Sequence, residues 1–404
     1  MDVALIKKKS IGWLKNTDWM EIIFLAIFTW MVIFRYLTTT SFTYDMSAEF
    51  FGNVNDIIRY ILIGYAVIRT IQQAIIYKKD YILRGIFIIL MAMVSYIVSD
   101  VTEDIEIYEI GLLIIAAQGT DWKTIAKVYV CIAVVIQLIA IYCVYTDVIP
   151  DYVYDAGVRG GRHSYGIIYP TDLAAHALFI MLVYTTIRGI KITFSETAVF
   201  AVTGYAVYNL TNARNDCICI AVLCIGIVVV KVLSMCNIRL SDYRIISITG
   251  VIFFVLCIGI IIAVTFYDPA NAAYVSLDDK LSGRISLSYQ ALADYGIQTW
   301  GSAVAEAGGG AGGTTDTYFF IDSSFIRIAV RCGWVFLSII TYIYYLCVTR
   351  AREHRQDMII LVFVVMAVFG ITEHHILEIA YCPLWLCLYS RDNNKECHNK
   401  IISK

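Results

Sequence analysis

Charged residues are scarce in this sequence. Asp, Glu, Lys and Arg make up only 16% of its 404 residues, whereas hydrophobic residues make up 59%. A soluble protein of this size does not need so large an apolar share, so the composition excludes an ordinary soluble protein and favours a polytopic helical membrane protein. The formal net charge is −2, so the chain also lacks the basic excess of a nucleic-acid-binding protein.

Several common binding and targeting motifs are absent as well. No nucleotide-binding motif appears, and the glycine-rich run 308–313 is not followed by the Lys-Ser/Thr pair of a phosphate-binding loop. Most of the 12 cysteines lie in apolar runs without the spacing of metal ligands, which is typical of small buried hydrophobic residues. The basic stretch 1–18 has no small-residue cleavage site, which indicates a cytoplasmic lead-in. We expect no cofactor, no metal and no nucleic-acid partner.

Long apolar runs dominate what is present. They predict one integral membrane domain, residues 1–404, of all-α class, with about 12 (10–12) transmembrane helices, because several runs are shorter than the ~20 residues that an upright span needs. The expected spans are residues 19–37, 57–76, 82–99, 106–118, 126–146, 166–187, 195–211, 215–234, 244–267, 323–348, 357–372 and 376–389.

The loops between these spans differ in their basic residues. If the N-terminus is cytoplasmic, the cytoplasmic segments hold most of the 31 Lys and Arg residues, which is the usual distribution in membrane proteins. The pattern predicts cytoplasmic N- and C-termini and one large outer loop, residues 268–322, between the ninth and tenth spans. The basic residues left in the outer loops are Arg159, Arg162, Arg214, Lys280 and Arg284.

Polar motifs surround most of these outer basic residues. The predicted topology brings five motifs to the outer face: Arg159-Gly-Gly-Arg162-His163, Asn212-Ala-Arg214-Asn-Asp216, Ser282-Gly-Arg284, Ile321-Asp322-Ser-Ser324 and Thr372-Glu373-His374-His375. Because all five lie on one side, they can share a single cavity that the large loop caps. For the first motif the alternative is a solvated connector.

The large loop contains Leu281-Ser282-Gly283-Arg284, followed by apolar residues at helical spacing. The pattern predicts an amphipathic helix over about 282–295 on the membrane surface, with Ser282 as its N-cap. The helix dipole disfavours a cation in the first turn, so Arg284 at this place indicates a bound anionic partner. The alternative is an arginine that contacts lipid phosphates.

Two further groups of arginines have structural interpretations beside functional ones. Arg214 can contact lipid phosphate or pair with Asp216 instead of binding a substrate. Arg327 and Arg331 lie four residues apart on one face of the tenth span, so they line a wet cavity or meet buried carboxylates. Structural pairing between helices is an equal alternative for these two.

In their order along the chain, the motifs resemble the O-antigen polymerase and ligase superfamily. The likeness rests on an Arg-containing loop that runs into a span (RGGRHSYGIIYPTDLAAH), an Arg at a short outer turn (NARND), a Gly-Arg at the start of an amphipathic helix (LSGRISLSYQAL) and an Asp-Ser-Ser that opens a span (IDSSFIRIAVRCGW). It covers roughly residues 155–390. Within the superfamily, the chain looks most similar to Wzy-type polymerases of bacterial capsular and exopolysaccharide clusters.

The resemblance implies a glycosyltransferase of the bacterial cytoplasmic membrane that works on the outer face, in capsular, exopolysaccharide or O-antigen synthesis. Such enzymes join oligosaccharide units carried on polyprenyl pyrophosphate. The implied partners are these lipid-linked sugars, the bilayer, and the flippase and chain-length regulator of the same pathway. Arg214 and Arg284 match the family's arginine positions, and we expect them to stabilise the pyrophosphate leaving group without a metal.

Asp322 stands where the ligase branch of the family usually has a histidine. We expect it to act as the general base or to position the acceptor sugar. Glu373, His374 and His375 compete for the role of base. The expected substrate-binding residues are Arg159, Arg162, His163, Arg327, Glu373, His374 and His375.

Two other functions stay open, a ligase and a transporter, and a third is disfavoured. A ligase would use the same chemistry to move a finished glycan to a different acceptor. A transporter of lipid-linked sugars would show internal repeats and many polar residues at mid-membrane, whereas the spans are apolar apart from Arg69, Arg327 and Arg331. A metal-dependent transferase would need a carboxylate pair near the first outer loops; Asp104 and Glu106 come closest, and we expect them to form a solvated acidic loop instead.

Overall fold

The computed structural model describes residues 18–44, 46–155, 161–308 and 318–391, and this part of the chain is mostly helical. Its α-helices are α2 (Trp19–Leu37), α3 (Ala48–Tyr77), α4 (Ile82–Thr102), α5 (Ile105–Ala116), α6 (Trp122–Tyr145), α7 (Pro170–Arg188), α8 (Phe194–Thr211), α9 (Arg214–Met235), α10 (Ile252–Thr265), α11 (Ala272–Lys280), α12 (Arg284–Tyr295), α13 (Ser324–Arg327), α14 (Gly333–Glu353) and α15 (Asp357–Phe369). Strands β1 (Val153–Asp155) and β2 (Gly161–His163) pair antiparallel.

Eight helices in the described part are long and apolar enough to cross a membrane. They cover Trp19–Leu37, Glu49–Tyr77, Ile82–Thr102, Trp122–Tyr145, Pro170–Lys191, Arg214–Met235, Ile246–Thr265 and Ser324–Glu353. Their apolar side chains face outward as well as inward; Leu83, for example, is 82% exposed. Lipid, rather than water, suits such a surface. The structure therefore supports the expected class, an all-α multi-pass membrane protein, and the larger number of crossings stays a prediction.

Local sequence explains where several of these helices begin. Asp18 caps α2, Asp104 caps α5 and Asp121 caps α6, each by accepting a hydrogen bond from a backbone N–H of the first turn. A capping box formed by Thr193 and Glu196 starts α8. These caps satisfy N–H groups that have no partner within the helix itself.

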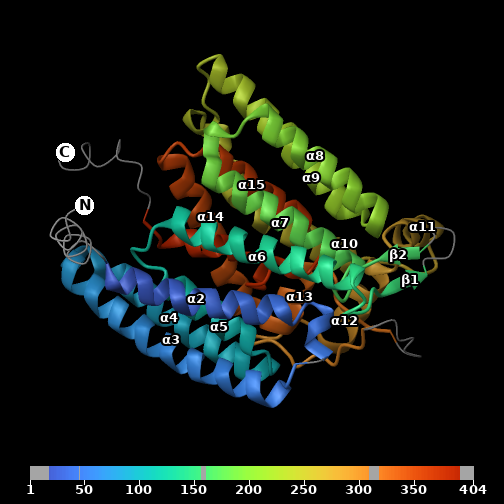
Figure 1. Cartoon of the computed structure of the whole chain (residues 1–404), viewed down its shortest axis with the longest axis horizontal. Coiled ribbons are helices and arrows are strands. Elements are labelled where there is room, and N and C mark those ends of the chain that lie inside the picture. The colour runs from blue at the N-terminus through green and yellow to red at the C-terminus, as the bar shows by residue number, and fades with distance from the viewer. Residues whose placement is uncertain (1–17, 45, 156–160, 309–317, 392–404) are drawn as a thin grey trace, which may run out of the picture.

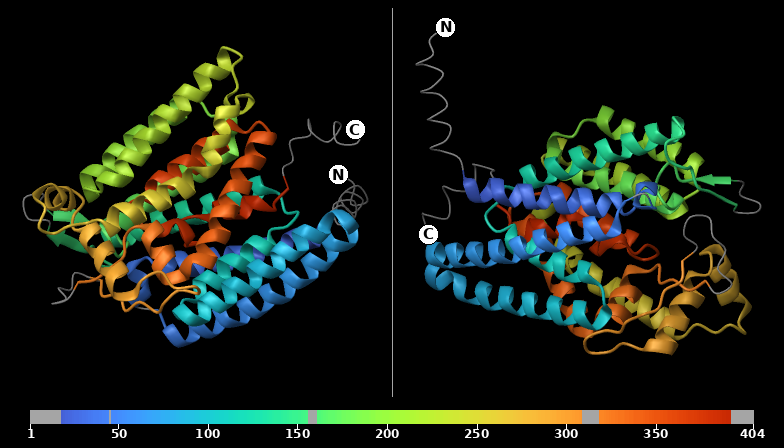
Figure 2. Two further views of the ribbon diagram at one scale, coloured as in Figure 1. Left: turned by 180° about the vertical axis from the view of Figure 1, so that it is seen from behind. Right: turned by 60° about the horizontal axis from the view of Figure 1, so that its bottom comes forward.

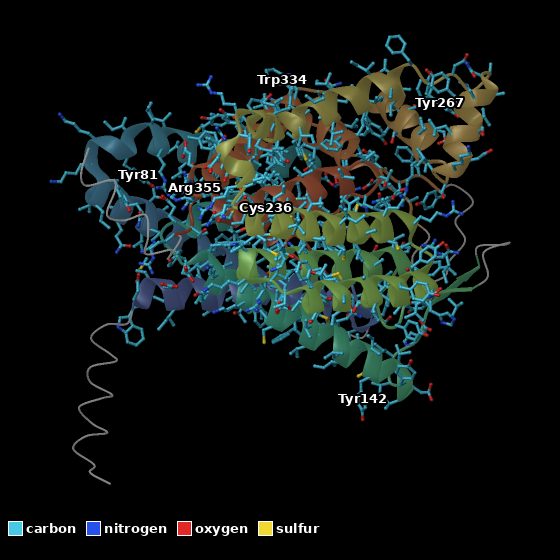
Figure 3. The ribbon with its side chains drawn as sticks, turned by 90° about the horizontal axis from the view of Figure 1, so that it is seen from above. Tyr81, Tyr142, Cys236, Tyr267, Trp334 and Arg355 are labelled. Atoms are coloured by element: carbon cyan, nitrogen blue, oxygen red, sulfur yellow. The ribbon has the colours of Figure 1, made fainter. Side chains whose placement is uncertain are left out.

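The helices run side by side between two ends of the molecule (Figures 1 and 2). One end, called the terminal end here, brings Arg391 within 3.7 Å of Glu21 and so joins the beginning and the end of the described chain. The opposite end, called the loop end, carries β1, β2, α11 and α12 (Figure 1). Figure 3 shows Tyr142 and Tyr267 toward the loop end, and Tyr81 and Arg355 toward the terminal end.

The last apolar stretch, expected as a span over 376–389, is not an α-helix. It forms short 3-10 helices, His375–Leu377 and Pro383–Leu388, whose side chains are mostly buried in protein. The residue before a proline avoids the α conformation, which prevents one continuous helix here.

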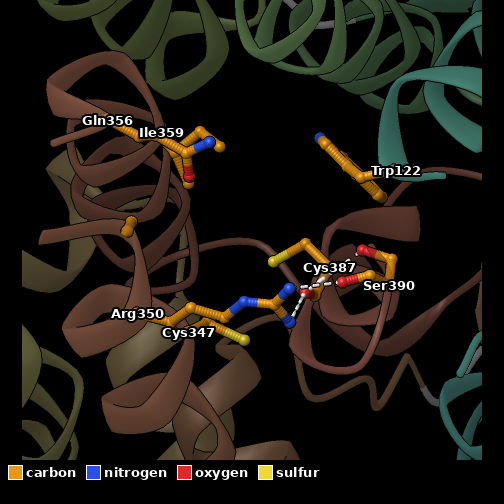
Figure 4. Close-up of a pocket in the computed structure, with 8 residues that line it drawn as sticks. Trp122, Cys347, Arg350, Gln356, Ile359, Cys387 and Ser390 are labelled. Carbon is orange, nitrogen blue, oxygen red and sulfur yellow. Dashed lines mark hydrogen bonds between the residues drawn. The ribbon is translucent and has the colours of Figure 1, made fainter. Parts of the chain in front are cut away.

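Side chains replace the missing helical hydrogen bonds of this stretch. Arg350 donates to the carbonyls of Cys387 and Ser390 at the terminal end (Figure 4) and also to that of Leu388. Trp385 Nε1 donates to the carbonyl of Ile376 at 2.5 Å. These contacts allow irregular backbone to be buried at membrane depth, since each buried carbonyl needs a donor.

A π-helical turn, Ile328–Cys332, separates α13 from α14. Residues 301–302 of the large loop pack against this turn. Ser302 N donates to Arg331 O at 3.0 Å. The two backbones approach closely because Gly301 and Gly333 both adopt positive φ, +89° and +77°, and a Cβ on Gly301 would lie 1.7 Å from Arg331 O. The loop is thereby docked between α13 and α14.

Candidate active site

Helix α12 begins differently from the expectation. Its N-cap is Gly283, with φ +79°, rather than Ser282. The Asp278 carboxylate accepts hydrogen bonds from Ile285 N at 2.8 Å and Ser286 N at 3.1 Å. The anion expected at this helix end is therefore a side chain of the protein itself, and the free N–H groups of α12 do not offer a phosphate site.

The side chain of Arg284 lies between two carboxylates. Its Nε donates to Asp322 Oδ2 at 3.2 Å, and its Nη2 lies 2.9 Å from Glu373 Oε1. Burial works against the charge, but Glu373 and Asp322 outweigh it and raise the pKa of Arg284, so the guanidinium stays charged. Its Nη1 group contacts no acceptor among the residues that the structure describes, and it keeps two N–H donors for a ligand.

The motif Ile321-Asp322-Ser-Ser324 positions both carboxylates. Asp322 supplies one of them directly. Ser324, at the start of α13, donates through its N–H and its hydroxyl to the carbonyl of Glu373, which fixes the backbone that carries the second. The sequence predicted only that Asp322 and Glu373 lie on the same side of the membrane. In the structure both carboxylates contact the guanidinium of Arg284.

Burial favours the protonated form of these carboxylates. It raises the pKa of Asp322, and Arg284 opposes this only in part; it likewise raises the pKa of Glu373. A third carboxylate, Asp216, is 1% exposed, and neither of its oxygens has a hydrogen-bond partner in the described part of the chain. Asp216 lies within electrostatic range of Glu373 and Arg284. The cluster therefore has more carboxylates than cations, and it can accept a proton.

His375 lies beside this cluster between two further carboxylates. Its Nδ1 is 3.0 Å from Glu378 Oε2, and its Nε2 is 3.4 Å from Asp172 Oδ1. Burial alone would lower the pKa of His375, but Glu378 and Asp172 raise it well above the ordinary value, which favours the imidazolium form. Burial and the neighbouring imidazolium lower the pKa of His374, which is therefore neutral.

Five rings in a row hold the two histidines in place. Tyr36, His176, Tyr381 and His375 follow one another with centroids 4.0 Å apart, and His374 comes next at 3.9 Å. The row begins on α2 and α7 and ends in the segment after α15. Rings packed on both faces leave His375 little freedom to rotate, so its two nitrogens stay directed at Glu378 and Asp172.

A charged cavity of about 110 Å³ adjoins the histidines. It is lined by Asp104, Glu106, Ile107, Arg327, Ile328, Arg331, Cys332, His374, Leu377 and Glu378. Glu306 pairs with Arg327 at 2.6 Å and with Arg331 at 2.9 Å. Arg327 and Arg331 therefore both line a cavity and meet partly buried carboxylates, and the contact of Arg331 with Asp104 at the start of α5 fits the alternative of structural pairing as well.

Asp104 and Glu106 do not form the expected solvated loop. Asp104 lies 3.2 Å from Arg331, and Glu106 lies 3.0 Å from Arg35, which also contacts the buried Glu109 at 2.6 Å. Both acidic residues are ion-paired parts of the loop end, because the start of α5 packs among Arg35 of α2 and Arg331 of the π-helical turn.

The first two motifs lie at the edge of this arrangement. Arg162 Nε donates to the carbonyl of Thr211 at 2.6 Å, which joins the β-hairpin to the end of α8 beside Arg214. Arg214 itself is exposed, and its side chain has no ion pair or hydrogen bond with another described residue, including Asp216. His163 is partly exposed and pairs with Asp151 at 2.6 Å. Arg159 lies outside the described residues.

Glu373, His374 and His375 are the described side chains best placed to hold a metal, since they offer ligand atoms within 4.8 Å of one another. Their other contacts disfavour it. Glu373 pairs with Arg284, and His375 Nδ1 is hydrogen-bonded to Glu378, so two of the three side chains already have partners. The donor set therefore fits hydrogen bonding better than metal binding.

Sequence reasoning missed four acidic residues of the site, Asp172, Asp278, Glu306 and Glu378. It named Asp216 but not its place in the cluster. Asp172 and Glu378 lie within a few residues of recognised motifs. Their proximity to these motifs could have identified them as candidate site residues. Glu306 carried no such signal, because its two arginines lie in another segment.

Comparisons with known proteins add no assignment to this geometry. No family model, no curated protein and no solved structure matches the chain. The functional interpretation therefore depends on the chemistry of the cluster and on where it lies in the fold.

Proposed function

We propose that the protein is a glycosyltransferase that polymerises oligosaccharide units carried on polyprenyl pyrophosphate. The observation that supports this most is the position of Arg284: the Nε and Nη2 edge of its guanidinium contacts Asp322 and Glu373, and Nη1 remains available for a ligand. A buried cation with donors to spare suits an anionic leaving group, and adjacent carboxylates of raised pKa suit proton transfer near neutral pH.

The reaction uses these groups as follows. A hydroxyl of the acceptor unit attacks the sugar carbon that is bonded to pyrophosphate, and a new C–O bond forms. The hydroxyl proton passes to a carboxylate, the bond to pyrophosphate breaks, and polyprenyl pyrophosphate leaves with the electron pair. Arg284 Nη1 donates to its oxygens, and the exposed Arg214 supplies a second cation.

Asp322 is the better of the two candidate bases at Arg284. Its side chain is 17% exposed, whereas that of Glu373 is 3% exposed. An acceptor hydroxyl has to reach the base within hydrogen-bond distance, so the more accessible carboxylate has the advantage. Glu373 then keeps Arg284 oriented.

In the proposed topology the chain crosses the cytoplasmic membrane of a bacterium about 12 (10–12) times. The N- and C-termini are cytoplasmic, and the loop end faces outward. The positive-inside pattern supports this orientation, because Lys78, Arg188, Lys231 and Arg350 lie at helix ends opposite the cluster. The cluster lies at one end of the bundle rather than at mid-membrane, which favours surface chemistry over transport.

The pathway context follows from this proposal. Lipid-linked repeat units of a capsular polysaccharide, exopolysaccharide or O-antigen would arrive by a flippase, and a chain-length regulator would limit the product. A ligase would use the same chemistry on a different acceptor, so the length of the product separates the two activities.

A deletion strain tests the proposal. Wild-type protein should restore long polymers, and a strain with Asp322→Asn should accumulate single repeat units while the variant protein remains in the membrane at normal amount. Long polymers that are present but not attached to their final acceptor would instead identify a ligase. Normal polymer in the Asp322→Asn strain would remove Asp322 from the mechanism.

A further inference from the structure

The charged cavity has walls of mixed chemistry. Carboxylates of Glu106 and Glu378 can accept hydrogen bonds, and Arg327 and Arg331 can donate them. Ile107, Ile328 and Leu377 add an apolar part to the same walls. A ligand that fits must donate, accept and present C–H groups at once.

Its charges are nearly balanced within the protein. Arg327 pairs with Glu306, and Arg331 pairs with both Glu306 and Asp104. His374 is neutral because burial and His375 lower its pKa. No unpaired cation is therefore available in the described cavity wall, and carboxylates line it as well, so a phosphate or pyrophosphate group would be repelled. The balance favours an uncharged polar ligand.

The cavity also has a suitable size. Its volume is about 110 Å³, several times the roughly 10–15 Å³ that one water molecule needs by this measure. A space of this size admits one small ring, and it is too small for a whole oligosaccharide repeat unit.

Two chain segments connect the cavity with the cluster around Arg284. Residues 322–327 carry Asp322 into the cluster and Arg327 into the cavity wall, and residues 373–378 do the same with Glu373 and Glu378. Phe320 joins the two segments by contacting both Arg327 and His374. The cavity and the cluster are thus formed by neighbouring parts of the same two segments, with Arg327 and His374 on the cavity side and Asp322 and Glu373 on the cluster side.

We propose that this cavity binds one uncharged sugar ring, the terminal residue of the acceptor unit, and presents its hydroxyl to Asp322. The identity of the ring as an acceptor rests on the proposed transferase function. The inference that the cavity binds a neutral sugar does not depend on that function, because the cavity's charge balance and wall chemistry support it independently.

Protection from a thiol reagent tests the proposal on the full-length protein in lipid nanodiscs. Leu377→Cys and Ile107→Cys place thiols in the cavity lining from two different segments, and Ile297→Cys, 36% exposed and outside it, is the control. A small water-soluble methanethiosulfonate reagent is applied alone, with glucose, galactose, rhamnose or N-acetylglucosamine, and with inorganic pyrophosphate. Mass spectrometry of the peptides follows each introduced thiol separately from the exposed Cys131 and Cys236.

We expect both cavity thiols to react, and at least one neutral sugar to slow them without slowing the control. A sugar at about ten times its dissociation constant should slow the reaction about tenfold by mass action. Unreactive cavity thiols, protection by pyrophosphate, or protection by none of the four sugars would each overturn the proposal; the last would indicate a cavity that holds only water. Because no turnover is required, such failure leaves the transferase proposal to be judged by polymer synthesis.

Discussion

Arg284 Nη2 lies 2.9 Å from Glu373 Oε1. This contact joins the first turn of α12, within the large loop, to the segment that follows α15. Breaking a buried pair is costly because it leaves a charge without its partner. The geometry of the cluster therefore depends on how the large loop is docked. A substitution that disturbs the docking should also disturb the cluster, and the reverse should hold.

Replacing Arg284 by lysine should keep the charge and lose the planar fork that serves two carboxylates and a ligand. We expect a loss of about 2 to 4 kcal/mol in transition-state stabilisation, as for other preorganised donors. The rate of polymer formation in reconstituted vesicles measures it. Arg188→Lys, at the terminal end, is the matched control and should retain its rate. Equal losses in both variants would argue against a specific role for the Arg284 fork.

The pH dependence of the reaction should report Asp322. Burial raises the pKa of Asp322 above the ordinary value of about 3.9. A base acts only when deprotonated, so kcat/KM should fall as pH drops through this raised pKa and be constant above it. In the Asp322→Asn variant the rate should be low, and this acid limb should be absent. If the limb persists in that variant, the base is another group, and Glu373 becomes the candidate.

The docking of the large loop should depend on Gly301. A Cβ there would lie 1.7 Å from Arg331 O at a φ of +89°, so Gly301→Ala should lower the melting temperature and the activity together. Gly259→Ala is the matched control, since no atom lies within 4 Å of its added Cβ. It should leave both properties unchanged or raise stability slightly. A Gly301→Ala protein as stable and active as the control would contradict the role of this close approach.

Thiol labelling in intact cells tests the orientation. Asn271 is exposed at the loop end, and Asn237 and Glu353 are exposed near the terminal end. Asn271→Cys should react with an impermeant reagent from outside, and Asn237→Cys and Glu353→Cys should react only after the membrane is opened. The opposite pattern would place the Arg284 cluster in the cytoplasm, where no polymerisation of exported repeat units could occur.

Hydropathy predicted most of the helical framework, because lipid-facing helices are apolar along their whole length. The expected span 19–37 coincides with α2 (Trp19–Leu37), and the one at 82–99 falls within α4. The stretch 376–389 was wrong as a helix for a physical reason. Its apolar residues are buried among other helices, and hydropathy cannot distinguish burial in protein from burial in lipid.

The site was predictable only in part. Motif order and loop charge placed Arg284, Asp322 and Glu373 on the same predicted side of the membrane. Topology predicts the side on which a residue lies but not the residues that it contacts. Which residues touch is decided by tertiary packing, and no local pattern indicated that Asp278 would cap α12 or that Glu306 would pair with two arginines.

Synthesis by the purified protein is the most direct test of the central claim. Wild-type protein in vesicles, supplied with repeat units on polyprenyl pyrophosphate and a metal chelator, should produce a ladder of longer lipid-linked products and release polyprenyl pyrophosphate. The same vesicles with Asp322→Asn should leave the substrate as single units. Folded wild-type protein that forms no product longer than one unit from its own organism's substrate, or that does so only when a divalent metal is restored, would contradict the account.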